Sequence, residues 1–110
     1  MDNISFSDFQ KLDLRVGEIK EVSEIPGLDE ILKLQVDLGE ELGERTLLAG
    51  LKRFITPGAL VGRQIIVVTN LEPKTIRGEV SEGMLLAADA KGRPVLVTTL
   101  ERVVPGSKVR

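Results

Sequence analysis

The segment Leu32-Lys-Leu-Gln-Val-Asp-Leu38 alternates apolar and polar residues without a break. Such an alternation predicts a strand with one face in a core and the other face in water. Gly39–Gly43 follows as a turn, and Arg45-Thr-Leu-Leu48 supplies a second apolar run. The sequence therefore predicts a β-hairpin at this point of the chain.

A further strand is expected before this hairpin, over Leu12–Val22. Its apolar residues change phase at Gly17, and a glycine at such a point is typical of a β-bulge, which would let the sheet curl. Arg15 falls on the polar face of this strand, where it is either solvated or directed at a ligand. Glu24–Asp29 separates the two strands and contains Pro26-Gly27, a typical turn pair.

The part of the chain after the hairpin predicts the remaining elements of a barrel. Thr56-Pro57 favours the start of a short helix, because proline suits the first helical turn. Gln64–Thr69 is a β-branched apolar run, which indicates a strand buried on both faces. Met84–Ala88 is expected as the fifth strand and Val95–Thr99 as a short extra one.

A short helix is expected at the beginning of the chain, over Ser5–Lys11. Ser5 or Ser7 could cap it, and Phe6 and Phe9 are spaced so that both can face the barrel as core residues. Five strands with a helix between the third and the fourth match the order of an OB-fold. We therefore expect one all-β domain over residues 1–110, a five-stranded Greek-key barrel at about 12–90 with a C-terminal extension at 91–110.

The composition excludes several classes of function. The 110 residues include no cysteine and no histidine, which excludes disulfides, a conventional zinc site and most nucleophile–base pairs. No apolar run approaches the roughly 18 residues of a membrane span, and the N-terminus lacks a secretory pattern. We expect a cytoplasmic, non-catalytic domain with no cofactor, no metal and no membrane contact.

The charges are divided unevenly along the chain. Residues 1–44 carry four cations and twelve acids, a net −8, whereas residues 45–110 carry eleven cations and five acids, a net +6. A polyanion responds to a local basic patch more than to the total of −2. The split therefore indicates a nucleic-acid partner, unless folding disperses the cations over opposite faces.

The stretch Asn70–Ala88 begins with a polar segment that lies between the apolar runs Ile65–Val68 and Met84–Ala88. It contains a carboxamide, two cations, a serine hydroxyl and a thioether, namely those of Asn70, Lys74, Arg77, Ser81 and Met84. On spacing alone it could be a solubilising surface loop. Lysine acts on phosphate as a point charge, whereas arginine can also fork to two oxygens or stack on a base. Only Phe54 among the three aromatic residues lies near the basic segment, which disfavours a protein that coats single strands by stacking.

Short motifs over nearly the whole chain resemble a known family. They are Asp13–Gly17, Val36–Gly39, Arg45-Thr46, Ala49–Leu51, Asn70–Lys74, Arg77-Gly78 and Ser81–Ala88. Residues 6–110 resemble the tRNA-binding domain at the C-terminus of many methionyl-tRNA synthetases, and its freestanding dimeric relatives. The resemblance implies an OB barrel, a homodimer, and tRNA binding that follows shape more than base sequence.

The resemblance also implies which residues face the RNA. They are Asn70, Lys74, Arg77, Ser81 and Met84, to which we add the cations Lys33, Lys52 and Arg53. Glu30 stands where the family often has a lysine, and we expect Lys52 and Arg53 to compensate for that loss. Ala49 stands where many members have serine, so we expect no hydroxyl contact there.

Three functions remain open at this point. The leading hypothesis is a tRNA-binding homodimer that acts as, or beside, a component of methionyl-tRNA synthetase. The second is a chaperone-like dimer that binds unfolded peptides, as described for another branch of the same family. The third is a domain that mainly dimerises a synthetase, for which the apolar residues of the extension at 91–110 could supply the interface.

Overall fold

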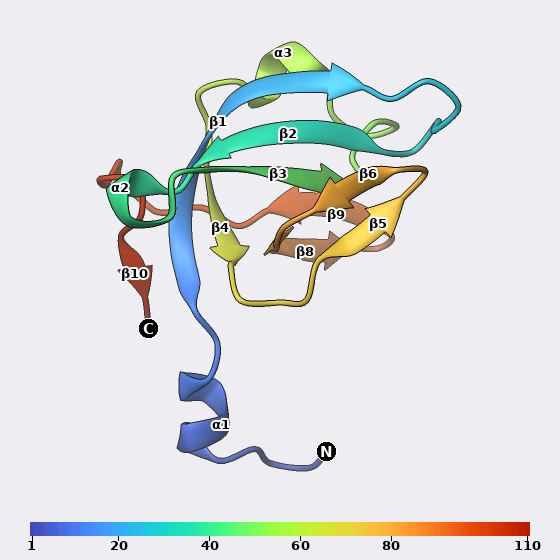
Figure 1. Cartoon of the computed structure of the whole chain (residues 1–110). Coiled ribbons are helices and arrows are strands. Elements are labelled where there is room, and N and C mark those ends of the chain that lie inside the picture. The colour runs from blue at the N-terminus through green and yellow to red at the C-terminus, as the bar shows by residue number, and fades with distance from the viewer.

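One antiparallel sheet, curled into a barrel, organises the protein. The computed structural model describes residues 1–110. In chain order the elements are α1 (Phe6–Gln10), β1 (Leu14–Glu24), β2 (Leu32–Asp37), α2 (Gly39–Leu42), β3 (Glu44–Ala49), α3 (Pro57–Leu60), β4 (Gln64–Val68), β5 (Lys74–Ile76), β6 (Glu79–Ser81), β7 (Met84–Leu85), β8 (Ala87–Ala90), β9 (Arg93–Leu96) and β10 (Lys108–Val109). The strand order is β3-β2-β1-β4-β7, and β10 also pairs with β1. Figure 1 shows the curled sheet, the separate hairpins β5–β6 and β8–β9, and α1 standing away from the barrel.

Strand β1 holds the sheet together because it pairs with three other strands. Its residues 18–24 pair with β2, and its residues 14–18 pair with β4. At its start, residues 14 and 15 also pair with β10. The strand therefore changes neighbours near its middle, where the sheet curls.

Gly17 lies where β1 changes its pairing partner, but the prediction of a β-bulge at this residue is wrong. The register shifts between Ile19 and Glu21 instead. The reason for a glycine is packing, since a Cβ at position 17 would lie 2.5 Å from Cγ1 of Val36 and 2.9 Å from Cδ2 of Leu38. Both side chains are fully buried, so the missing Cβ lets them fill the barrel beneath β1.

The core has two parts, one on each face of β4. Every residue of β4 is buried, as predicted from its apolar run. The inner part fills the barrel and consists of Ile19, Leu32, Leu34, Val36, Leu38, Leu47, Ala49, Leu51, Leu60, Ile65 and Val67. The outer part contains Leu14, Val16, Ile66 and Val68, against which Phe9, Leu86, Val103 and Val109 pack. The extension thus covers an apolar face that the barrel alone would expose.

The OB-like barrel expected from the sequence is confirmed, with two differences. The predicted fifth strand is broken at Leu86, because β7 pairs with β4 whereas β8 pairs with β9. The segment before it is not one loop, since it contains the hairpin β5–β6. The barrel is nearly closed by the amide of Glu82, which donates to the carbonyl of Thr46 in β3 at 2.9 Å.

The short helices follow their local signals. Ser5 caps α1, and its Oγ accepts a hydrogen bond from the amide of Asp8 at 3.0 Å. Pro57 occupies the first turn of α3, as predicted. Of the two phenylalanines in α1, Phe9 packs on the outer core. The prediction is wrong for Phe6, which is 72% exposed.

Arg15 is buried in an ion cluster rather than facing a ligand. It is 5% exposed, its Nε donates to Asp13 at 2.7 Å, and its Nη1 donates to Glu41 at 3.2 Å and to the carbonyl of Gly106 at 3.4 Å. The guanidinium lowers the pKa of both carboxyls below the usual range. The cluster joins β1, α2 and the last turn, and so fixes the extension to the barrel.

We expect Gly17→Ala to destabilise the fold by about 1–3 kcal/mol, the usual cost of overpacking a core. Gly58→Ala is the matched control, because its added Cβ would meet no atom within 4 Å and its position is helical. Urea denaturation followed by circular dichroism measures both variants. A Gly17→Ala protein as stable as the Gly58→Ala control would contradict the packing role of Gly17.

Candidate nucleic-acid interface

The hairpin β5–β6 carries three of the predicted site residues at defined positions: Lys74, Arg77 and Ser81. Lys74 pairs with Ser81 at the open end, and Ile76 pairs with Glu79 beside the turn. The turn residues Arg77 and Gly78 have φ angles of 49° and 80°. Hairpins with a two-residue turn favour positive φ at both turn residues, but a residue other than glycine adopts such an angle at a cost in free energy. Such outliers concentrate at functional sites, and this one places Arg77 at the hairpin tip.

The tip of this hairpin lies close to the turn between β1 and β2. A Cβ on Gly27 would lie 3.2 Å from Nη1 of Arg77, so the guanidinium lies beside this glycine. Gly27 has a φ of 84°, which already favours a residue without a Cβ. The structure therefore brings Arg77 to a loop that is 50 residues away in the sequence.

Lys74 and Arg77 differ from the other candidate cations, because no acidic side chain pairs with them. Both are exposed. By contrast Lys33 pairs with Glu79 at 3.0 Å, Lys52 with Glu24 at 2.7 Å and Arg53 with Glu30 at 3.3 Å. Lys74 and Arg77 are thus available to phosphate without first breaking an ion pair.

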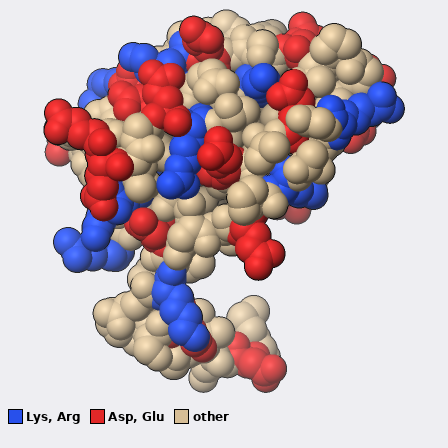
Figure 2. Space-filling view, viewed as in Figure 1, with Lys and Arg blue, Asp and Glu red and all other residues tan.

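Ion pairs in the folded chain join the acidic first half of the sequence to the basic second half. Acids of the first half, Glu18, Glu24 and Glu30, meet cations of the second half in the folded chain. Figure 2 accordingly shows Lys and Arg interspersed with Asp and Glu on this face, rather than one continuous basic surface. Three of the eleven cations of the second half are paired in this way, so folding neutralises part of the expected basic half.

A groove of about 550 Å³ runs beside the hairpin, and we call it the hairpin groove. Three predicted site residues line it: Lys74, Ser81 and Met84. Met84 is 53% exposed, so its thioether is not a core group. Apolar side chains of Ile31, Leu48, Leu71 and Ile76 form much of the walls, and one acidic residue, Glu72, also lines the groove. A cation at the edge and an adaptable apolar floor suit a phosphate and a base.

Ser81 lines the hairpin groove, but its hydroxyl already forms hydrogen bonds within the fold. It is 7% exposed, and its Oγ accepts from the amide of Leu48 at 3.0 Å and donates to the carbonyl of Gly83 at 3.0 Å. The hydroxyl joins the hairpin to β3. Its predicted contact with RNA does not fit this placement.

Asn70 is likewise committed to the fold. Its Oδ1 accepts from the amide of Asp13 at 2.8 Å, and its Nδ2 donates to the carbonyl of Lys11 at 2.6 Å. Both ends of the carboxamide therefore fasten the N-terminal segment to the end of β4. Asn70 does not line the hairpin groove.

The hairpin itself and the apolar groove walls were missed by sequence reasoning. A signal for the hairpin was present, since β-branched Thr75, Ile76 and Val80 flank the Arg77-Gly78 turn pair. The walls had no local signal, because Ile31, Leu48 and Leu71 come from three separate segments.

Comparisons with known proteins place the chain among tRNA-binding domains. Residues 14–108 match the family described as "Putative tRNA binding domain". The chain is 50% identical over 107 residues to methionine–tRNA ligase of Pyrococcus abyssi, which covers 97% of this chain and 14% of that enzyme. A crystal structure of a MetRS related protein from Pyrococcus horikoshii is 34% identical, covers 100% of both chains and superposes with a TM-score of 0.92. A CsaA chaperone protein from Picrophilus torridus is 32% identical over 98% of this chain and 100% of its own, with a TM-score of 0.91.

We expect Ser81→Ala to destabilise the protein by about 1–3 kcal/mol, because the partly buried amide of Leu48 loses its acceptor. The affinity for tRNA, measured on folded protein, should stay unchanged. Thr75→Ala is the control, since it removes an exposed hydroxyl of the same hairpin and should cost no more than about 0.5 kcal/mol. If Ser81→Ala loses affinity for tRNA but keeps the stability of the wild type, the Ser81 hydroxyl contacts the RNA and this placement is contradicted.

Proposed function

We propose a function from the premise that the chain belongs to the tRNA-binding domain family, a family of binding domains rather than catalysts. The chain binds tRNA through the hairpin groove and the adjacent cations Lys74 and Arg77. The observation that carries this proposal is that these two cations, alone among the predicted site cations, have no acidic partner. None of the helices is long and apolar enough to cross a membrane.

The chemistry of the groove favours recognition of shape over base sequence. Two free cations neutralise phosphates, which occur at every nucleotide and carry no sequence information. Ser81 and Asn70 use their polar groups within the fold, so few side chains remain to read base edges. Met84 offers apolar contact that any base can make. The domain therefore raises affinity for tRNA in general.

The partner that fits this role is a methionyl-tRNA synthetase catalytic chain. The domain spans 14% of the P. abyssi enzyme to which it is similar, so it corresponds to a small part of such a synthetase. In our proposal it increases the local concentration of tRNA near that chain, whether linked to it or separate. This role places it in the cytoplasm, where tRNA is aminoacylated.

Peptide binding is the second candidate, because two solved chaperone structures share this fold at 32% identity. The apolar walls of the hairpin groove are compatible with such a ligand. The dependence on salt separates the two functions. Phosphate contacts weaken steeply with salt, whereas burial of apolar peptide groups does not.

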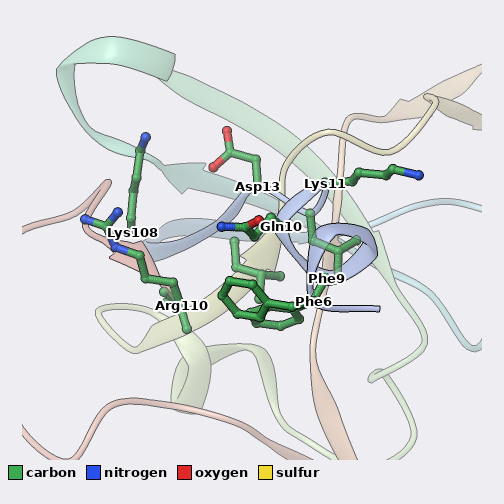
Figure 3. A pocket seen from close by; sticks show the side chains of 10 residues that line it. Phe6, Phe9, Gln10, Lys11, Asp13, Lys108 and Arg110 are labelled. Atoms are coloured by element: carbon green, nitrogen blue, oxygen red, sulfur yellow. The ribbon is translucent and has the colours of Figure 1, made fainter. Parts of the chain in front are cut away.

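A homodimer is proposed through α1 and the depression beside it, which residues 108–110 at the end of the extension also line, and not through the apolar residues at 95–104. The extension is largely folded onto the barrel, where Leu96 and Val103 pack against the two core clusters. Helix α1 contains no buried residue and projects from the barrel (Figure 1). Beside it lies a depression of about 300 Å³, and Figure 3 shows Phe6 and Phe9 on one side of it, with Lys108 and Arg110 on another. The exposed phenylalanine ring is suited to insertion against a second copy.

We expect Lys74→Glu and Arg77→Glu each to weaken tRNA binding at low salt. Each lost phosphate contact should reduce the slope of log affinity against log salt by about 0.7–0.9, so the double variant loses about 1.4–1.8. Lys20→Glu is the control, because it reverses an exposed charge on β1 that does not line the hairpin groove. Filter binding measures the four variants and the wild type. Unchanged slopes in the Lys74 and Arg77 variants would remove the site assignment.

We also expect the wild-type chain to sediment as a dimer and Phe6→Asp to sediment as a monomer. Leu100→Asp is the matched control, since Leu100 is a fully exposed apolar residue outside α1. Analytical ultracentrifugation distinguishes the two states. A monomeric wild type, or a dimer that survives Phe6→Asp, would contradict the proposed interface.

A further inference from the structure

The hairpin groove continues around the barrel into two further depressions. Gly50 lines both the hairpin groove and a middle depression of about 310 Å³. Pro94 lines both this middle depression and a third one of about 290 Å³ beside α3 and β9. The three hollows therefore adjoin one another, and we call the series the barrel track.

The third depression carries two free cations. Arg63 and Arg93 both line it, both are exposed, and neither forms an ion pair. No acidic residue lines this depression, and its apolar walls include Ile55 and Leu60. Nε of Arg63 donates to the carbonyl of Ala59 at 3.2 Å, which fixes the side chain and leaves its two terminal nitrogens free. A ligand that fits must combine negative charge with an apolar part.

The uncharged polar side chains between these arginines already form hydrogen bonds within the fold. A ligand would therefore interact mainly with the positive charges of Arg63 and Arg93. Nε2 of Gln64 donates to the carbonyl of Val103 at 2.6 Å. The hydroxyl of Thr98 donates to the carbonyl of Gln64 at 2.7 Å. Specific hydrogen bonding to a ligand is therefore limited to the two guanidinium groups.

The middle depression contains the one aromatic ring outside the N-terminal segment. Phe54 is 50% exposed and lies beside the small residues Ala87 and Ala88 of β8. The acid in this hollow, Asp89, already accepts a hydrogen bond from the amide of Gly92 at 2.6 Å. An exposed ring beside two alanines leaves room for a flat group, and every nucleic-acid base has a face that can stack there.

We propose that an unpaired segment of the bound RNA follows the barrel track. In this arrangement a base stacks on Phe54, and Arg63 and Arg93 contact phosphates beyond it. The inference rests on the proposed function, because the track begins at the hairpin groove that contains Lys74 and Met84. An unpaired strand fits better than a duplex, since splayed bases can enter small hollows whereas stacked pairs cannot.

The test compares intact tRNA with a blunt-ended RNA duplex, using fluorescence anisotropy at several salt concentrations. For Arg63→Gln/Arg93→Gln we expect weaker tRNA binding and a salt slope smaller by about 1.4, from two lost contacts to a single strand. Binding of the blunt duplex should change no more than it does in the Lys20→Gln control. Equal effects on both ligands would overturn the assignment to an unpaired strand.

Substitutions of Phe54 test the proposed stacking of a base independently of the charges. We expect Phe54→Leu to weaken tRNA binding about fivefold or more, the low end of base–aromatic stacking, and Phe54→Tyr to retain it. Equal affinities of the Leu and Tyr variants would contradict a stacked base.

The outcomes separate this inference from the proposed function. If the Arg63/Arg93 and Phe54 variants bind tRNA like wild type while Lys74→Glu and Arg77→Glu weaken it, only the track is wrong. If wild type shows no salt-dependent binding of tRNA, the proposed function itself fails. Binding of an acidic unfolded peptide that requires Arg63 and Arg93, with tRNA unaffected, would also overturn the RNA assignment.

Discussion

The close approach of β1 to the buried side chains of β2 and its following turn is the constraint on which the barrel depends. Gly17 leaves room for Val36 and Leu38 at the point where β1 passes from β4 to β2. A Cβ in that space would force these two side chains to shift while β1 pairs with both neighbours. The curl of the sheet in turn brings β3 next to the β6–β7 segment, which forms the hairpin groove.

The polar residues near the groove fall into two groups with different physical roles. Ser81 and Arg45 satisfy backbone groups beside the groove, and Asn70 fastens the N-terminal segment to the end of β4. Lys74 and Arg77 have no such commitment and face water. A rigid wall beside a few unpaired cations is the arrangement that lets a small acidic protein attract a polyanion locally, despite its net charge of −2.

Features set by local periodicity could be predicted from the sequence, whereas those set by distant pairing could not. The alternation over Leu32–Leu38, the Ser5 cap and the proline at the start of α3 were all recognisable. The two partners of Asn70 were not, and neither was the Leu48 partner of Ser81, since these backbone groups are 57, 59 and 33 residues away. For the same reason, the sequence could not show that acids of the first half neutralise cations of the second half.

The claim that tRNA lies in the hairpin groove is tested most directly at Met84. The chain contains two methionines, and the other is Met1 at the N-terminus. A protein labelled with ¹³C at the methionine methyl groups therefore gives two assignable signals. On addition of tRNA, we expect the Met84 signal to shift, added salt to reverse this shift, and the Met1 signal to stay in place. Binding of tRNA with an unmoved Met84 signal would contradict it.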